Sequence, residues 1–145
     1  MANPKTGSRN GDVLAGLLPE VAVIAEKHLA LCLKVGIELV VVQSFRSIEE
    51  QARLYAIGRT VPGRKVTNAR PGSSWHNFRR AYDVAVMEDG EITWASSKYS
   101  EAGEIGKSIG LVWGGDFKSV RGDLGHFEYH PGLTIAQAKN EERRR

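Results

Sequence analysis

The sequence predicts an α+β fold, because segments of helical and of strand-like pattern alternate along its 145 residues. Residues 39–42, Leu-Val-Val-Val, form a β-branched run typical of a buried strand. Residues 88–91, Glu-Asp-Gly-Glu, are typical of a hairpin turn and favour antiparallel pairing of the flanking strands. We therefore expect one small domain over residues 1–145, a central, mainly antiparallel sheet flanked by helices, and flexible ends at 1–11 and 140–145.

The N-terminal part of the chain has the apolar pattern of a helix, a strand and a second helix. Apolar residues at helical spacing predict one helix from a cap at Asn10 or Asp12 to Gly36. A strand is expected over residues 37–45. Ser47 and the glutamate three residues later form a capping box, which predicts that a short helix starts there.

The rest of the chain alternates loops with short elements. A loop without periodicity follows the second helix, and loops of this length are more often functional than idle. The elements expected after it are strands at 81–87, 92–94, 111–113 and 125–129, a helix at 97–109, a loop at 114–122 and a terminal helix capped by Thr134.

Composition indicates an ordinary globular protein, with 41% hydrophobic and 26% charged residues, a net charge of +3 and an isoelectric point near 9.1. No segment approaches the roughly 18 apolar residues of a membrane span, and the N-terminal residues lack the apolar core of a secretory signal. The chain is mildly basic, but its sequence contains no recognisable nucleic-acid-binding motif. The single cysteine, Cys32, lies in an apolar run and excludes thiolate-rich metal sites.

Two histidines and an aspartate carry the clearest chemical signal. His76 precedes a predicted strand, Asp83 lies within it, and His126 lies on the last strand. An unpaired carboxylate at Asp83 would cost on the order of several kcal/mol, so a metal, an arginine or backbone donors must compensate. If a metal binds, this ligand set suits zinc or the iron of facial-triad oxygenases, and the six residues between His76 and Asp83 favour zinc. The other histidines, His28 and His130, are expected to be ordinary core or surface residues.

Asp123, three residues before His126, is a candidate general base. Residues three apart on one regular strand face opposite sides, so Asp123 must lie in the preceding loop to reach the same metal. Gly122 and Gly125 make such a bend feasible. The base would take a proton from water and return it to a leaving amine, a role that suits a carboxyl pKa raised by partial burial.

These residues resemble the motifs of the LAS-type zinc peptidases, which are M15-like peptidases of bacterial cell walls. Residues 74–83 resemble the family's Ser-x-His-x-x-Gly-x-Ala-x-Asp motif, and residues 123–128 resemble its second motif. Residues 43–46 and 113–116 resemble its flanking elements. The second motif, Asp-x-x-His-Phe-Glu, is more similar to the L-alanyl-D-glutamate branch, which includes phage endolysins, than to the D,D-peptidases.

The resemblance implies one zinc ion, held on the sheet by His76, Asp83 and His126, with Asp123 as the general base. The function it implies is a peptidase that cleaves the L-alanyl-D-glutamate bond of peptidoglycan stem peptides. Two alternatives stay open: a D,D-carboxypeptidase that releases terminal D-alanine, and a non-catalytic, zinc-stabilised domain that binds the cell wall. Asp123 favours the enzyme, since a structural metal site has no use for a base.

The resemblance also implies supporting roles. Arg46 would orient the substrate or stabilise the oxyanion. Ser74 and Gln51 would be substrate-binding or supporting contacts, and Glu128 would buttress a metal ligand. One residue departs from the motif: Arg79 stands where the family has glycine, and if that position needs a positive φ, Arg79 strains the turn between His76 and Asp83.

The expected partners are peptidoglycan stem peptides, with neither nucleic acid nor membrane insertion, and the chain is expected to act as a monomer. The resemblance to phage endolysins, with the lack of a secretory signal, places the chain in the cytoplasm of the host bacterium. From there it would reach the wall by a separate route such as a holin.

Overall fold

The structure is a computed structural model that describes residues 4–117 and 123–145. The elements are α1 (Pro4–Leu14), α2 (Pro19–Lys34), β1 (Glu38–Gln43), α3 (Ile48–Ala56), the 3-10 helix η1 (Trp75–Phe78), β2 (Ala81–Glu88), β3 (Glu91–Thr93), α4 (Lys98–Ser108), β4 (Val112–Trp113), the 3-10 helix η2 (Gly114–Asp116), β5 (His126–Glu128) and α5 (Ile135–Arg143). The strands pair antiparallel in the order β1-β2-β5-β4, and β3 also pairs with β2. The predicted α+β fold with an antiparallel sheet is confirmed.

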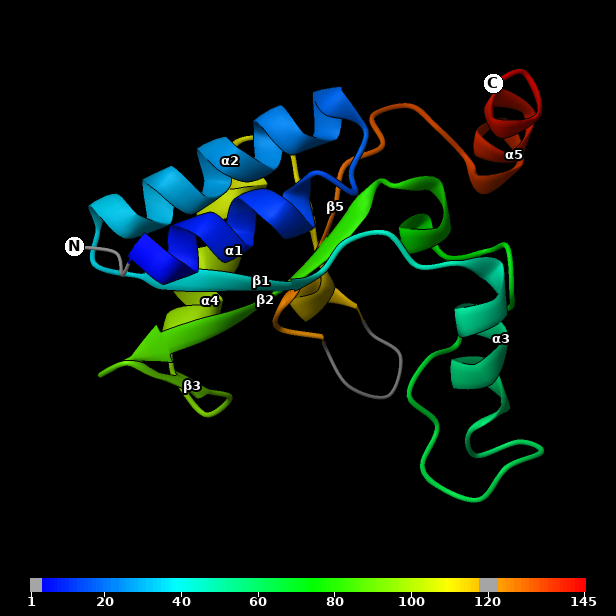
Figure 1. Cartoon of the computed structure of the whole chain (residues 1–145), viewed down its shortest axis with the longest axis horizontal. Coiled ribbons are helices and arrows are strands. Elements are labelled where there is room, and N and C mark those ends of the chain that lie inside the picture. Colours follow the sequence, from blue (N-terminus) through cyan, green and yellow to red (C-terminus); the bar gives the residue numbers. More distant parts are fainter. Residues whose placement is uncertain (1–3, 118–122) are drawn as a thin grey trace.

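The two faces of the sheet have different neighbours. Alternation along β2 turns Tyr82, Val84 and Val86 toward the main hydrophobic core, which also contains residues of α1, α2 and α4. Asp83 points to the opposite face, which carries polar side chains. In Figure 1, α1 and α2 lie along the sheet, whereas α3 and the long loop after it stand apart, beyond the end of β1. The face of the sheet that carries Asp83, here called the open face, holds the candidate site.

The prediction of one N-terminal helix is wrong, because the structure has two helices, α1 and α2. Pro19 is the first residue of α2, where its missing N–H costs nothing, but it prevents the helix from continuing from α1. Leu18 accordingly has extended backbone, with φ −59° and ψ 146°. Among the described residues, no helix is long and apolar enough to cross a membrane.

The flexibility expected for residues 1–11 and 140–145 stays a prediction, although helices form in both stretches. Helix α1 starts at Pro4 and α5 continues to Arg143. The side chain of Asn10 explains why α1 is held: its Nδ2 donates to the carbonyl of Leu39 and its Oδ1 accepts from the N–H of Val41, at 2.9 and 2.7 Å. Because β1 is at the edge of the sheet, the Asn10 amide satisfies backbone groups that would otherwise have no strand partner.

The expectations for His28 and Cys32 are confirmed, since both are fully buried in the core. The ring of His28 bonds the Tyr82 hydroxyl through Nδ1 at 2.8 Å and the Ala102 carbonyl through Nε2 at 2.9 Å. Burial raises the pKa of the Cys32 thiol to about 12, so this thiol is inert at neutral pH.

Candidate active site

Strand register builds the base of the site. Asp83 on β2 pairs with His126 on β5, and on its other side with Gln43 on β1. The second pairing requires an irregularity in β1. Val41 pairs with Val84, and the next two residues of β1 lie opposite a single residue of β2, Asp83. This β-bulge places Gln43, rather than its apolar neighbour, beside Asp83. Three strands thus present polar side chains in one row across the open face.

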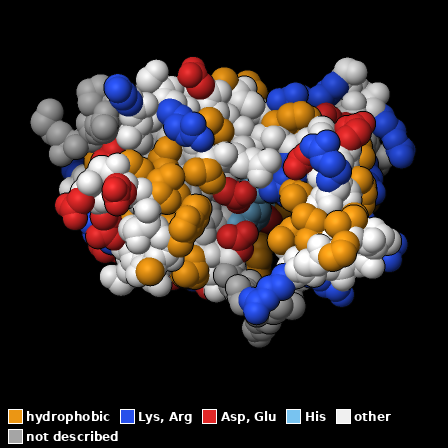
Figure 2. Space-filling view, turned by 60° about the horizontal axis from the view of Figure 1, so that its bottom comes forward, with side chains coloured by type: hydrophobic (Ala, Val, Ile, Leu, Met, Phe, Trp, Pro, Cys, Tyr) orange, Lys and Arg blue, Asp and Glu red, His pale blue; other side chains and the backbone are white. Residues whose placement is uncertain are grey.

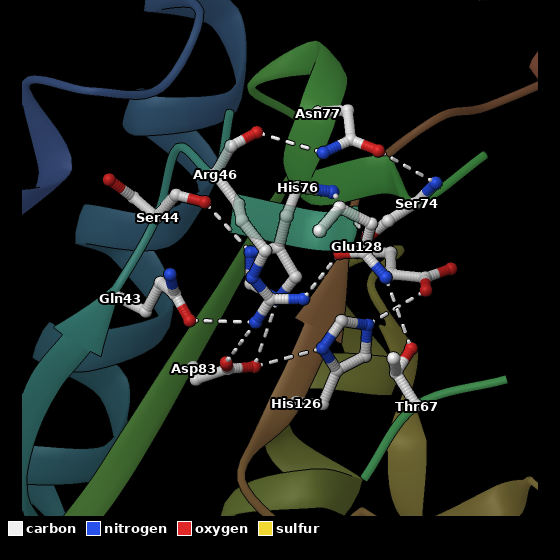
Figure 3. Close-up of polar contacts among 11 residues, drawn as sticks. Gln43, Ser44, Arg46, Thr67, Ser74, His76, Asn77, Asp83, His126 and Glu128 are labelled. Carbon is white, nitrogen blue, oxygen red and sulfur yellow. Dashed lines mark hydrogen bonds and ion pairs between the residues drawn. The ribbon is translucent and has the colours of Figure 1, made fainter. Parts of the chain in front are cut away.

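Three candidate metal ligands converge on this row, as the sequence predicts (Figure 3). His76 comes from η1, Asp83 from β2 and His126 from β5, and their ligand atoms all lie within 4.8 Å of one another. Oδ1 of Asp83 is 2.9 Å from Nδ1 of His126 and 3.3 Å from Nε2 of His76. The arrangement can hold one metal ion with two imidazole nitrogens and a carboxylate oxygen.

The second nitrogen of each imidazole is already occupied. His76 Nδ1 donates to the backbone carbonyl of Ser44 at 2.7 Å, which leaves Nε2 as the ring atom with a free lone pair. His126 Nε2 donates to Oε2 of Glu128 at 2.7 Å, which directs Nδ1 toward Asp83. Each ring is thus fixed by a partner behind it, as metal-binding histidines typically are.

Electrostatics within the site favour charged pairs. Burial lowers the pKa of His126, but hydrogen bonds to Asp83 and Glu128 outweigh it and raise this pKa to about 10. Burial raises the pKa of Glu128, but hydrogen bonds from His126 and His130 lower it to about 2. The pKa of Asp83 is likewise lowered by both neighbouring histidines against the effect of burial. A proton on His126 therefore occupies the position where a metal ion would bind.

Arg46 lies beside the ligands and is held from two sides. Its guanidinium donates to Oε1 of Gln51 at 2.9 Å and to Oε1 of Gln43 at 2.7 Å. The same group is 3.8 Å from Oδ2 of Asp83, and the side chain is only 11% exposed. Arg46 is thus a fixed cation next to the candidate metal position, which fits the role that the sequence resemblance implies for it.

Gln51 and Ser74 are placed behind the site and not on its open side. Gln51 is fully buried, and besides holding Arg46 it donates to Thr67 Oγ1 and to the Ala69 carbonyl in the long loop. Ser74 is the N-cap of η1, and its hydroxyl accepts from the N–H of His76 at 3.2 Å. Of the two roles that the sequence left open, this geometry favours support over contact with a substrate.

Asp123 lies in the loop before β5, as the argument from strand geometry predicts. Gly122, which was expected to help the bend, lies outside the described residues, but Gly125 is described and has room for no side chain, since a Cβ would be 2.3 Å from the Val84 carbonyl. Although Asp123 is exposed, desolvation and the charge of Asp83 raise the pKa of its carboxyl. A raised pKa suits a general base.

The metal position lies in a hollow of the surface. Figure 2 shows histidine at its floor, acidic side chains beside it and hydrophobic side chains on both flanks. The partly exposed ring of Phe117 is 5.8 Å from that of His126. A hollow with a polar floor and apolar flanks can bind an extended peptide.

Sequence reasoning missed His130, which the structure connects to the site. Its Nε2 donates to Oε1 of Glu128 at 2.7 Å, and its ring stacks on that of Trp75 with centroids 3.9 Å apart and planes 9° apart. The expectation of an ordinary core or surface residue did not anticipate these two contacts. The overlooked signal is the spacing of His126, Glu128 and His130, because every second residue of an extended chain faces the same side.

Arg79 has the left-handed conformation that a family glycine would adopt freely, with φ 60° and ψ 34°. Position 79 therefore needs a positive φ, so Arg79 strains the turn between His76 and Asp83. The side chain also makes contacts of its own: the guanidinium donates to the Gly16 carbonyl at 2.9 Å and lies 4.0 Å from the ring centroid of Phe45. These contacts offset part of the backbone cost.

Comparisons with known proteins agree with this site. A family described as D-alanyl-D-alanine carboxypeptidase matches residues 67–129, the stretch that holds the three candidate ligands. The chain is similar to the peptidoglycan L-alanyl-D-glutamate endopeptidase CwlK of Bacillus subtilis strain 168, with 39% identity in an alignment of 129 residues that covers 82% of this chain and 77% of CwlK.

Two solved structures share the fold. The L-Ala D-Glu endopeptidase ChiX of Serratia marcescens superposes with a TM-score of 0.64 at 22% identity, over 84% of this chain and 86% of ChiX. The vancomycin resistance D,D-pentapeptidase VanY, solved in complex with Zn(II), superposes with a TM-score of 0.60 at 17% identity, over 86% of this chain and 84% of VanY.

Two substitutions of Arg79 separate its strain from its contacts. Arg79→Ala keeps the left-handed backbone but loses both contacts, so we expect the free energy of unfolding to fall by about 1–2 kcal/mol. Arg79→Gly loses the contacts but also the strain, and we expect its stability to stay within about 0.5 kcal/mol of the parent, with activity retained. Urea denaturation of the three proteins measures this, and equal destabilisation by both substitutions would contradict it.

Proposed function

The chain belongs to the peptidase M15 family of metallopeptidases, and we propose that it cleaves the L-alanyl-D-glutamate bond of peptidoglycan stem peptides with one zinc ion. The observation that carries this proposal is the convergence of His76, Asp83 and His126. The carboxylate of Asp123 is close enough to interact electrostatically with all three. The choice of bond is supported by the 39% identity to CwlK over 82% of this chain.

Zinc fits the residues present. Two imidazoles and one carboxylate, with a base nearby, form a typical catalytic zinc site with an open position. The Ser44 carbonyl and the Glu128 carboxylate already hold the non-ligating ring nitrogens, so the lone pairs of His76 Nε2 and His126 Nδ1 face the same point. Zinc held by these residues would supply Lewis-acid polarisation of the scissile carbonyl.

Two residues of this chain supply the remaining chemistry. The Asp123 carboxylate takes a proton from the attacking water and passes it to the leaving amine nitrogen, and its raised pKa matches this task. The Arg46 guanidinium, fixed by Gln43 and Gln51, presents a positive charge to the oxyanion that develops at the scissile carbonyl. Because Arg46 is already held in place, it needs little reorganisation during the reaction.

Zinc binding is expected to release a proton from His126. With a pKa of about 10, His126 is protonated in the metal-free protein at neutral pH, and this proton must leave before Nδ1 can bind zinc. Zinc affinity should therefore rise about tenfold per pH unit between about pH 7 and 9. Calorimetric titration in buffers of different ionisation enthalpy counts the protons released, and a count of zero at pH 7 would contradict this assignment.

Mass spectrometry of peptidoglycan fragments tests the proposed reaction. Purified peptidoglycan incubated with the protein should yield new L-alanine carboxyl ends and D-glutamate amino ends. A chelator should abolish the products and added zinc should restore them. Release of free D-alanine would instead identify a D,D-carboxypeptidase, and zinc binding without any cleavage would identify a non-catalytic wall-binding domain.

A pair of aspartate substitutions provides the matched control for that experiment. Asp123→Asn should reduce the rate by roughly 10²–10⁴, because the general base is lost, while zinc binding is retained. Asp89→Asn changes another exposed aspartate, which lies in the turn between β2 and β3 and outside the proposed site, and should leave the rate unchanged. Equal rates for the two variants would exclude Asp123 as the base.

We further propose that the protein acts as a phage-type endolysin, stored in the host cytoplasm and released to the wall through a holin. The similarity of its second motif to the branch that includes endolysins supports this role. Expression in a bacterium with a susceptible wall should leave cells intact until a holin gene is co-expressed, and should then cause lysis. Co-expression of the Asp123→Asn variant with the holin is the control, and lysis without any holin would refute the proposed route.

A further inference from the structure

A stripe of three residues runs along β5 and beyond its end. His126, Glu128 and His130 alternate with Phe127 and Tyr129, so extended backbone turns all three toward the open face of the sheet. Glu128 bridges the two histidines: one carboxylate oxygen accepts from His126 Nε2 and the other from His130 Nε2, both at 2.7 Å. The Glu128 side chain is only 12% exposed, so its orientation depends on these two partners.

The far end of the stripe contacts the segment that carries the other histidine ligand. The ring of His130 lies flat on that of Trp75, with centroids 3.9 Å apart. Trp75 is the first residue of η1 and directly precedes His76. Beside the stack, the N–H of Tyr129 donates to the Arg80 carbonyl at 2.9 Å, so the same part of the chain is also joined to the residues just after η1.

We propose that His130 and Trp75 are positioning residues, which act through Glu128 to fix the His126 ring and to hold η1 at the correct distance from β5. The stack of His130 on Trp75 connects the two histidine-bearing segments, and Asp83 separately connects the rings of His76 and His126. Neither His130 nor Trp75 reaches the metal position itself. This inference rests on the proposed function, in that the imidazole being positioned is taken to be a zinc ligand.

Two substitutions of His130 separate its hydrogen bond from its stacking. His130→Phe keeps an aromatic ring against Trp75 but cannot donate to Glu128. We expect this variant to bind zinc about tenfold more weakly, which is the lower end of the range for losing a hydrogen bond that supports a metal ligand. His130→Gln retains an N–H donor and should recover affinity to within about threefold of the parent. Competition between the protein and a chromophoric zinc chelator measures these affinities.

Trp75→Ala and Trp94→Ala form a matched pair for the stack. Trp94 also stacks on another ring, that of Tyr99, but it follows β3 at the opposite end of β2 from Asp83. We expect Trp75→Ala to weaken zinc binding and Trp94→Ala to leave it unchanged. Without zinc, both variants should unfold at urea concentrations close to that of the parent. A change in zinc affinity then reports the position of a ligand and not the general stability of the fold.

A metal-free readout keeps this test independent of the proposed function. Nitrogen NMR of the histidine rings in zinc-free protein should show altered His126 resonances in His130→Phe and nearly native ones in His130→Gln. If the parent binds no zinc, the proposed metalloenzyme fails, but the NMR result still decides whether His130 positions His126. Unchanged His126 resonances, or zinc binding by His130→Phe within about twofold of the parent, would overturn the proposal.

Discussion

The carboxylate of Asp83 constrains everything around it. It lies on the open face of a central strand, in a row with a residue from each neighbouring strand, and its side chain is 22% exposed. A half-buried charge in the middle of a sheet needs partners, and the fold supplies two histidines and an arginine within 4 Å. Each partner comes from a different segment, so the contacts of this one carboxylate join η1, β5 and the loop after β1.

Alternation along the strands lets one sheet serve two purposes. On β2 and β5, Tyr82, Val84 and Phe127 enter the hydrophobic core, while their neighbours Asp83 and His126 face the site. A slip of one residue in the pairing would exchange these faces, placing charges in the core and apolar groups in the site. The core therefore fixes the geometry of the site, since the register that buries Phe127 opposite Tyr82 is the same register that sets His126 beside Asp83.

The supporting residues place the remaining parts with little freedom. The Ser74 hydroxyl accepts from the N–H of His76 and the Ser44 carbonyl accepts from its ring, so this ligand is held at both its backbone and its side chain. Gln51 connects Arg46 to the long loop through Thr67 and Ala69. Geometry fixed before substrate arrives is what electrostatic catalysis requires, because little reorganisation is then needed when charge develops.

Much of the fold followed from local patterns, and so did the core of the site. The β-branched run of β1, the hairpin between β2 and β3, and the caps at Ser47 and Thr134 are signals within a few residues, and each is found where the sequence predicts it. Pro19 was also a local signal, but the apolar periodicity that runs across it concealed the break between α1 and α2. Asp83 could be singled out because a polar residue in an apolar strand needs a partner, and the resemblance to the family motifs implied the full ligand set.

What the sequence determined by itself was the set of chemical groups and the elements that carry them. The tertiary structure decided which groups meet. The bulge that sets Gln43 beside Asp83, the hydrogen bonds from Gln51 to the long loop, and the stack of His130 on Trp75 each join residues far apart in the chain. Such contacts depend on strand register and on the packing of η1 against β5, and no pattern within a single segment encodes a distance to another segment.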